Sequence, residues 1–362
     1  MSLAIRERVS ALIPVRNEAE DIAQAVRSLA AQPEVIEIIV ADDDSSDCTP
    51  GILDDLQSEV PHLRVVKVGD PPKGWLGKSH ALTVASREAS GNWLLFTNAD
   101  TVHQPGSLGH LLERAQRDHV DLLTLSPGQQ TPTWWEKAVI PFVFVELARR
   151  FRFDEVSNPK SKIAAANGQY LLIRRTVYDL AGGHEALHEE ILDDVALARR
   201  VKSLGRRILF LPGAQWVSTR MYRHFRAMWR AWQKNLYLLW GGSPFPPLFA
   251  VTRIWLLDLA PPLGFLLGLG LLAGGGGLEA AFIAAGCLAL TVARRVTYGH
   301  AVTRLGYAPG IANYGIPGAA IFWALMLASL ATHRWLGSVR WKGRTYSANG
   351  SPGRSPGQST TP

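Results

Sequence analysis

The sequence predicts an α/β domain with a mixed, mostly parallel sheet, followed by helices that lie on a membrane and helices that cross it. Two observations support this. Short apolar runs alternate with stretches of helical spacing over residues 9–100, and uncharged apolar stretches dominate after residue 248. Strands that alternate with helices indicate a sheet covered by helices on both faces. Only 19% of the residues are charged, below the roughly 25% of a typical soluble domain.

The elements of the N-terminal part can be placed in order. Ile22, Val26 and Leu29 recur at helical spacing after the first apolar run. The expected strands are residues 9–15, 35–41, 63–68 and 93–97, and the expected helices are 17–31, 49–57 and 79–89. Acidic residues gather directly after two of these strands. Ligands of such sheets bind at the carboxyl ends of the strands, so we expect the site there.

The charge of the chain is unevenly distributed. The net charge is +7, but residues 280–362 contain eight basic and no acidic residues, and the remaining 279 residues have a net charge of −1. The excess therefore belongs to the apolar C-terminal quarter, where it suits an anionic bilayer, and we expect no nucleic-acid partner. Cys48 and Cys287 form no disulfide or metal pattern, which favours a reducing compartment.

Three segments carry candidate ligand-binding groups. The acidic run 42–47 follows a strand and offers carboxylates to a ribose or base, although it also suits a solvated turn or helix cap. Asp100 with Asn98 could hold Mg²⁺ or Mn²⁺, cations that take oxygen ligands and share them with phosphates. Residues 71–78 form a Gly- and Lys-containing loop that opens a helix and suits a diphosphate.

Four ordered motifs together resemble the family 2 glycosyltransferases of the GT-A fold, in particular the membrane-bound enzymes associated with hopanoid or carotenoid glycosylation. The motifs are Pro14-Val15-Arg16-Asn17-Glu18, the stretch Val40 to Asp47, Gly74-Trp75-Leu76-Gly77-Lys78, and Asn98-Ala99-Asp100. The resemblance covers residues 9–240, and the membrane forms also share Trp341-Lys342-Gly343-Arg344. It implies a metal-dependent transferase of the hexosyltransferase class that uses a nucleotide-sugar donor.

The resemblance also implies roles for individual residues. Glu18, Asp42 and Asp43 would contact the nucleoside, Lys78 would lie near the diphosphate, and Asp100 would bind the metal. The family usually has Asp-x-Asp where this chain has Asn98, which removes one negative charge. An amide can still accept a hydrogen bond or lend its oxygen to a metal, so the change predicts weaker metal affinity or an altered donor preference.

Asp193 and Asp194 are the candidates for the catalytic base. They precede a helical run over residues 195–204 and could serve only as helix-capping acids. The family's Glu-Asp pair falls on them, and its second member is the general base, so the resemblance assigns that role to Asp194 and a supporting role to Asp193. One base without an evident nucleophile predicts single displacement with inversion.

Further residues are candidates for the acceptor or product side. The small-residue stretch 164–170, with Gly168 and Gln169, permits close approach of a ligand or forms a tight turn. The family has a Gln-x-x-Arg-Trp motif where this chain keeps Gln233 after Trp232. These two lie in residues 216–247, which predict an interfacial helix with Arg220, Arg223, Arg226, Arg230 and Lys234 on one side and Trp-rich apolar residues on the other. A soluble amphipathic helix is the alternative, and residues 134–151 suggest a second interfacial helix.

Residues 248–335 predict two or three membrane spans, the third if the middle one continues past Arg294 and Arg295. Asp258 could make a polar contact with the substrate at the membrane boundary. Alternatively, it could pair with Arg253 or extend its carboxylate to the membrane surface. Three spans would place the basic tail 336–362 outside, against the positive-inside rule, so we favour a re-entrant segment and a cytoplasmic tail. The chain from about residue 347 is expected to be disordered.

The expected organisation is therefore a GT-A domain over residues 1–215 in the cytoplasm, attached to the cytoplasmic membrane by a multi-pass region. The expected function is an inverting transfer from a UDP- or GDP-sugar to a lipid or polyisoprenoid acceptor. Two alternatives stay open at this point. One is a non-catalytic membrane scaffold with a degenerate sugar-nucleotide domain, and the other is transfer to a polyprenyl phosphate.

Overall fold

The computed structural model describes residues 7–336, 338–341 and 344–347, which divide into two compact units. The first unit contains residues 7–128 and 151–221 and the strand pair near the C-terminus, and the second contains 129–150 and 222–336. The sequence places 129–150 in the N-terminal domain. The structure places it in the second unit, because the helix in this segment packs among the other apolar helices.

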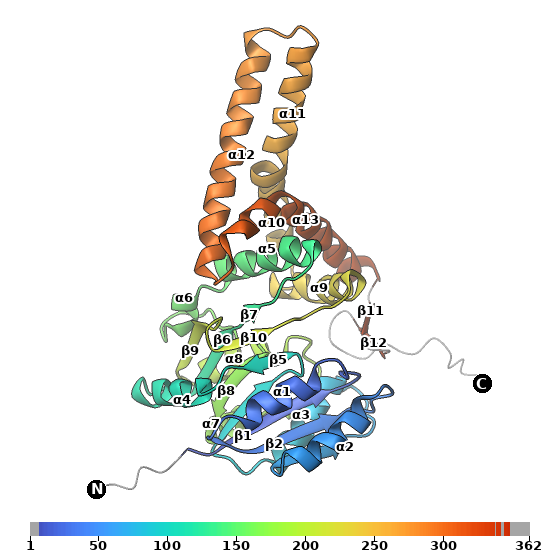
Figure 1. Ribbon diagram of the computed structural model, residues 1–362, viewed down its shortest axis with the longest axis vertical. Helices are drawn as coiled ribbons and strands as arrows, with labels where there is room; N and C mark the ends of the chain where they lie inside the picture. The colour runs from blue at the N-terminus through green and yellow to red at the C-terminus, as the bar shows by residue number, and fades with distance from the viewer. Residues whose placement is uncertain (1–6, 337, 342–343, 348–362) are drawn as a thin grey trace, which may run out of the picture. The chain divides into compact units, whose positions relative to one another are not determined.

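A seven-stranded sheet forms the centre of the first unit (Figure 1). Its order is β3(Leu63–Lys67), β2(Val35–Asp42), β1(Val9–Val15), β4(Trp93–Thr97), β8(Tyr170–Arg174), β6(Leu122–Ser126) and β9(Ile208–Pro212). The strand β8, fifth in this order, runs antiparallel to both neighbours, and all other pairs are parallel. The expected mixed, mostly parallel α/β sheet is confirmed.

The sheet is buried on both faces, as parallel sheets generally are. Ala11 and Ile13 of β1 belong to the core on one face, while Leu12 belongs to the core on the other. This alternation follows from the pleat of a strand, which directs successive side chains to opposite faces. All five residues of β4 are buried as well, so polar groups can reach solvent only where these strands end.

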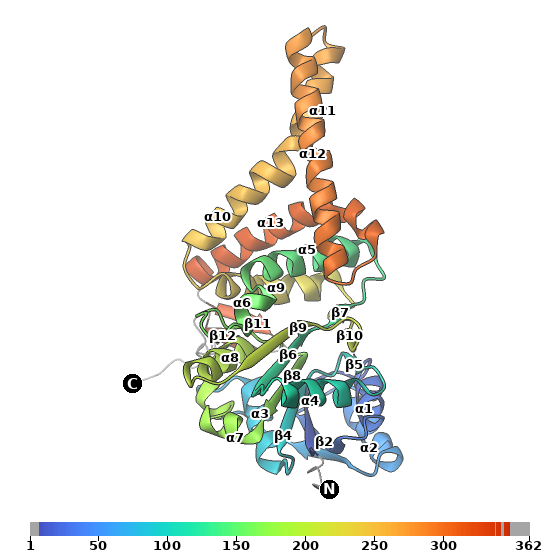
Figure 2. The ribbon, with the colours of Figure 1, turned by 90° about the vertical axis from the view of Figure 1, so that its left-hand side faces the viewer.

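Helices cover both faces and connect the strands (Figure 2). They are α1(Ile22–Ala30), α2(Thr49–Glu59), α3(Gly77–Glu88), α4(Ser107–Arg117), α6(Phe153–Ser157), α7(Arg175–Leu180), η1(Glu185–Leu187) and α8(Asp193–Ser203). A small second sheet has the order β5(Thr101–His103), β10(Val217–Thr219), β7(Gly128–Gln129). The helix α3 begins at Gly77, the last residue of the Gly-Trp-Leu-Gly motif, and α8 begins at Asp193. The first residues of both helices lie at the edge of the sheet where β1 and β4 end.

The second unit is helical. Its elements are α5(Trp134–Arg150), α9(Phe225–Leu239), α10(Phe245–Ile254), η2(Trp255–Leu259), α11(Ala260–Ala273), α12(Leu278–Arg304), η3(Pro309–Tyr314), α13(Gly315–Ala331) and η4(Thr332–Leu336). Three helical segments are long and apolar enough to cross a membrane, covering Phe245–Ala273, Leu278–Arg304 and Pro309–Trp335. The middle one does continue past Arg294. The helix α5 is buried from Ala138 to Glu146 and contacts α13, so it is not a helix that lies exposed on a surface.

The helices α11 and α12 form a hairpin through small residues (Figure 1). A Cβ added at Gly264 would lie 2.6 Å from Sγ of Cys287, and one at Gly268 would lie 2.8 Å from Ala284. Glycines four residues apart let two membrane helices approach closely. The outward surface of the hairpin is apolar, with exposed side chains at Leu263, Leu266, Leu267, Leu269, Phe282, Ile283, Leu288 and Leu290. Such a surface suits lipid rather than water.

Buried ion pairs lie in the helical unit. Asp258 Oδ1 and Arg294 Nη2 are 2.7 Å apart, with side chains 10% and 23% exposed. Pairing of Asp258 with Arg253, one of the three alternatives for this residue, does not occur, because Arg253 pairs with Glu146 of α5, which also pairs with Arg149. The π-helical turn η2 carries Asp258 toward α12, a pairing over 36 positions that no local spacing reveals.

The C-terminal strand pair consists of β11(Ser338–Trp341) and β12(Arg344–Ser347). In the expected Trp-Lys-Gly-Arg motif, Trp341 ends β11 and Arg344 begins β12, and Lys342 and Gly343 lie outside the described residues. The disorder expected from about residue 347 concerns residues 348–362, which also lie outside the described part of the chain.

Candidate active site

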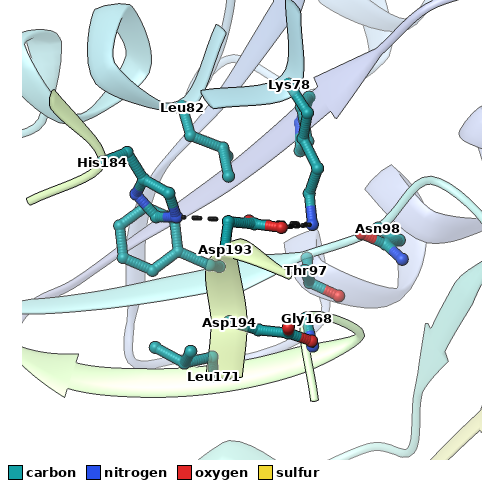
Figure 3. A pocket seen from close by; sticks show the side chains of 11 residues that line it. Lys78, Leu82, Thr97, Asn98, Gly168, Leu171, His184, Asp193 and Asp194 are labelled. Carbon is teal, nitrogen blue, oxygen red and sulfur yellow. Dashed lines mark hydrogen bonds and ion pairs between the residues drawn. The ribbon is translucent and has the colours of Figure 1, made fainter. Parts of the chain in front are cut away.

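A pocket opens in the first unit where β1 and β4 end and where α3 and α8 begin (Figure 3). Five of the residues singled out in the sequence line it, namely Lys78, Asn98, Gly168, Asp193 and Asp194. The other lining residues are Pro14, Leu82, Phe96, Thr97, Leu171 and His184. Segments far apart in the chain therefore bring a lysine, two carboxylates and an amide to one place.

Lys78 is the cationic group of the pocket. It is the second residue of α3, and its Nζ lies 3.0 Å from Oδ2 and 3.1 Å from Oδ1 of Asp193 (Figure 3). Burial works to lower the pKa of Lys78, but Asp193, Asp194 and Asp100 raise it above the usual value. The lysine therefore keeps its positive charge, and its side chain remains partly open to solvent.

Asp193 is the more deeply buried of the two carboxylates, with its side chain 8% exposed. Burial by itself raises the pKa of Asp193, yet the charges and hydrogen bonds of Lys78 and His184 outweigh it and hold the pKa below the usual range. His184 contributes through Nε2, which lies 3.5 Å from Oδ2 of Asp193. Asp193 is therefore an ionised group held between two partners, which leaves it poorly suited to accept a proton.

Asp194 is directed differently. Its Oδ2 accepts a 2.8 Å hydrogen bond from the backbone N–H of Gly168, and its Oδ1 accepts one from the N–H of Val195. Burial, and then the neighbouring charge of Asp193, raise the pKa of Asp194 above the ordinary value of 3.8. Two adjacent carboxylates whose environments move their pKa values apart are the pattern expected of a supporting acid and a base.

Gly168 separates Lys78 from Asp194. A Cβ added at Gly168 would lie 3.1 Å from Nζ of Lys78 and 3.4 Å from Oδ2 of Asp194. The ammonium and the carboxylate thus converge on the same small volume. Any residue other than glycine would fill part of it, which explains why a stretch of small residues enters β8 here.

The loop before α3 is fastened to the loop before α8. The ring of Trp75 packs on that of His188, with centroids 5.1 Å apart, and the N–H of Leu76 donates to the carbonyl of His188. Gly74 has a φ of +95°, a conformation that favours glycine. The Gly-Trp-Leu-Gly motif therefore fixes where Lys78 starts its helix relative to Asp193.

The acidic residues after β1 and β2 form a second cluster, beside the pocket rather than in its lining. Asp43 is buried and its Oδ2 lies 3.6 Å from Nη1 of Arg16, while Asp42 accepts a hydrogen bond from the N–H of Ser45. The N–H of Glu18 donates to Thr49 Oγ1. These bonds join the two loops, and their residues lie at the carboxyl ends of adjacent parallel strands.

Of the two residues expected to hold a metal, Asn98 and Asp100, only Asp100 supplies a carboxylate. Asn98 lines the pocket, and Asp100 lies close enough to Lys78 to raise the pKa of that lysine. Within the described residues, no cluster of three or more His, Cys, Asp or Glu side chains could hold a metal by itself. A hard cation that takes one carboxylate and an amide oxygen and shares the phosphates of its substrate fits this donor set.

Three of the candidates for the acceptor side do not line the pocket. Gln169 is buried, and its Nε2 lies 3.3 Å from Oγ1 of Thr219. Gln233 and Trp232 belong to α9 of the second unit, where Nε2 of Gln233 donates to Thr332 and Trp232 is buried. None of the three is among the pocket-lining residues.

The sequence analysis did not identify His184. This histidine is 2% exposed and lines the pocket beside Asp193. A single histidine has no spacing pattern that could mark it. The available signal was the Gly182-Gly183 pair before it, whose φ values of +80° and +54° force a tight turn.

Comparisons with known proteins agree with this geometry. The family model described as glycosyl transferase family 2 matches residues 10–180. The 4,4'-diaponeurosporenoate glycosyltransferase of Staphylococcus aureus (strain USA300) is 26% identical over 342 residues, which cover 93% of this chain and 87% of that protein. The protein of the same name from Staphylococcus haemolyticus (strain JCSC1435) is 24% identical over 254 residues, covering 69% of this chain and 66% of the relative, just under two thirds.

Among solved structures, a mannosyltransferase from Pyrobaculum calidifontis, in complex with GDP-Man and Mn²⁺, matches with a TM-score of 0.53. The identity is 18%, and the match covers 92% of this chain and 88% of that one, so it supports the fold. The mixed sheet, the ordered motifs and these relatives together show a glycosyltransferase with a GT-A domain, whose residues 10–180 are similar to glycosyl transferase family 2.

Proposed function

We propose that this enzyme transfers a sugar from a UDP- or GDP-sugar to a lipid or polyisoprenoid acceptor, with inversion of the anomeric centre. The observation that carries the proposal is the convergence of Lys78 and Asp194 on Gly168. A cation for the departing diphosphate and a base for the incoming hydroxyl then lie close enough to act on one bound donor, and in a single displacement the base would lie across the anomeric carbon from the diphosphate.

Asp194 is the general base in this proposal. The pKa of Asp194 is raised, so this carboxylate accepts a proton from an alcohol more readily than an ordinary aspartate does. The N–H of Gly168 holds its Oδ2 in a fixed direction. Asp193 stays ionised beside Lys78 and orients that lysine before the donor binds. Asp194 thus acts as the base, and Asp193 as the supporting residue.

The donor would lie across the carboxyl ends of β1, β2 and β4. Glu18, Asp42 and Asp43 supply acceptors for the hydroxyl and N–H groups of a nucleoside. Lys78 at the start of α3 supplies positive charge for the diphosphate. Asp100 and Asn98 would hold a Mg²⁺ or Mn²⁺ ion, which when bound supplies charge to stabilise the leaving diphosphate.

The acceptor is proposed to be a membrane lipid. Curated relatives are named as diaponeurosporenoate glycosyltransferases, and this chain carries three helices able to cross a membrane. Gly168 and Gln169 would lie on the acceptor or product side. Transfer to a polyprenyl phosphate is distinguished from transfer to an alcohol by the product formed.

The location proposed is the cytoplasmic membrane, with the first unit in the cytoplasm. The hairpin of α11 and α12 crosses and returns, and α13 instead packs against α5 and α9. The C-terminal strand pair belongs to the same compact unit as the catalytic sheet. Both facts support a tail on the same side as the catalytic unit, which agrees with its basic residues and the positive-inside rule.

The test uses the purified full chain with Mn²⁺ or Mg²⁺, a panel of UDP- and GDP-sugars and extracted membrane lipids. Mass measurement should find a lipid heavier by one sugar residue, and NMR of the product should show an inverted anomeric configuration. A product with the donor's configuration would contradict the inverting mechanism. Nucleotide binding without turnover of any donor would favour the non-catalytic scaffold.

A further inference from the structure

The pocket contains a buried chain of polar groups that extends behind Asp193. Tyr178 is 4% exposed and His184 is 2% exposed, and the oxygen of Tyr178 lies 2.9 Å from Nδ1 of His184. Nε2 of the same ring lies 3.5 Å from Asp193, whose other partner is Lys78. Tyrosine, histidine, aspartate and lysine thus follow one another from the core to the pocket. Figure 3 shows the last three of them.

The hydrogen-bond roles in this chain follow from what each group can donate. An ionised carboxylate only accepts, so Nε2 of His184 carries the proton that faces Asp193. Nδ1 of His184 lies within hydrogen-bond distance of the Tyr178 oxygen, which also lies 3.3 Å from Oγ of Ser86. The Tyr178 oxygen accepts the backbone N–H of His184 at 3.0 Å. Both ring nitrogens of His184 therefore face a polar group.

The surrounding structure holds the ring in place. Phe96 of β4 meets His184 edge-on, with ring centroids 4.8 Å apart, and also packs on Tyr178. The turn before His184 needs its glycines, because a Cβ at Gly183 would lie 2.8 Å from the ring of Tyr178. Only this tight turn brings the N–H of His184 to the Tyr178 oxygen.

We propose that His184, fixed by Tyr178, is a positioning residue that keeps Asp193 partnered when Lys78 leaves it for the diphosphate of the donor. Lys78 holds both oxygens of Asp193 and is also the only lysine among the pocket-lining residues described. A buried carboxylate that loses its sole cation is costly, so without His184 Asp193 would retain Lys78 and weaken nucleotide binding. The inference rests on the proposed function, because it needs a diphosphate for Lys78 to bind.

The experiment compares two variants that differ in reach. The side-chain amide of Gln extends to about the position of Nε2, and that of Asn to about Nδ1, so His184→Gln keeps the donor to Asp193 and His184→Asn loses it. We expect His184→Asn to weaken binding of UDP or GDP about tenfold by calorimetry, with a larger change in donor KM than in kcat. His184→Gln should restore binding to within about threefold of wild type, and Tyr178→Phe should fall between the two.

Controls separate this inference from the others. His62→Asn alters a histidine at the opposite end of the sheet and should bind like wild type, and melting temperatures show whether each variant is folded. Equal loss in His184→Asn and His184→Gln, or wild-type binding in His184→Asn, would overturn the positioning role. A wild-type protein that binds neither UDP nor GDP would instead overturn the proposed function.

Discussion

The backbone N–H of Gly168 donates a 2.8 Å hydrogen bond to Oδ2 of Asp194. This bond links the loop that enters β8 to the first turn of α8, and it points the carboxylate at the space that Lys78 also faces. A hydrogen bond to the charged form lowers a carboxyl pKa, but burial and the charge of Asp193 outweigh it here. Asp194 is therefore a carboxylate with a fixed direction and a raised pKa, as the proposed base requires.

Gly168→Ala tests this convergence. The added methyl group would lie 3.1 Å from Nζ of Lys78 and 3.4 Å from Asp194, so one of them must move. We expect kcat/KM to fall roughly 10- to 100-fold, since displacement of a reacting group by a fraction of an ångström is costly. Gly51→Ala is the matched control, because a Cβ there meets nothing within 4 Å. Steady-state kinetics on both variants measure the difference, and equal activity would contradict the convergence.

The raised pKa of Asp194 predicts the pH dependence of the reaction. A base works only when deprotonated, so kcat/KM should decline as the pH falls through the pKa of Asp194. Because that pKa lies above 3.8, the decline should begin at a higher pH than an unperturbed aspartate would give. The measurement is a pH–rate profile at saturating metal. Activity that stays constant down to pH 4 would show that no group with a raised pKa is required.

Two substitutions test the metal site, one that removes a carboxylate and one that adds a carboxylate. Asp100→Ala should remove the dependence of nucleotide binding on Mn²⁺, since it deletes the one carboxylate expected there. Asn98→Asp adds a second carboxylate and should strengthen Mn²⁺ binding about tenfold, because affinity for hard cations rises with the charge of the ligands. Nucleotide binding titrated against Mn²⁺ reports both effects. Unchanged metal dependence in Asp100→Ala would place the metal elsewhere.

The helical unit offers a stability prediction. Arg294→Ala leaves Asp258 buried without its cation, which is expected to cost about 3–5 kcal/mol. Arg295→Ala is the control on the same helix, since Arg295 is exposed and bonds the side chain of Asn313. Thermal unfolding in detergent should show a clear loss for Arg294→Ala and a small one for Arg295→Ala. Similar melting temperatures for the two variants would mean that the buried pair is not stabilising.

Much of this fold was predictable because its signals are local. Apolar runs marked β1 to β4, and the polar motifs directly after them placed the site at the strand ends. Lys78 and Asp194 could be named from the resemblance of the motifs, and the structure brings both to one pocket. Their roles remain proposals, and their proximity over 116 positions is a finding of the structure.

Other features depended on contacts that no local pattern encodes. His184 is placed by a glycine turn and by Tyr178, and Asp258 meets Arg294 through a π-helical turn. The apolar helix α5 has the composition of an interfacial element, yet it is buried in the helical unit because α13 returns to cover it. The partners of Asp258 and α5 lie far along the chain, and His184 reaches the distant Asp193 only through the tertiary fold.

Asp194→Asn gives the most direct test of the catalytic claim. The substitution keeps the shape of the side chain and removes its ability to accept a proton, so sugar transfer to the lipid acceptor should fall at least about 100-fold. Binding of UDP or GDP, measured on the same preparation by calorimetry, should stay within about threefold of wild type, because the substitution leaves both Lys78 and Asp193 in place. Transfer near the wild-type rate, or loss of nucleotide binding equal to the loss of transfer, would contradict the assignment of Asp194 as the base.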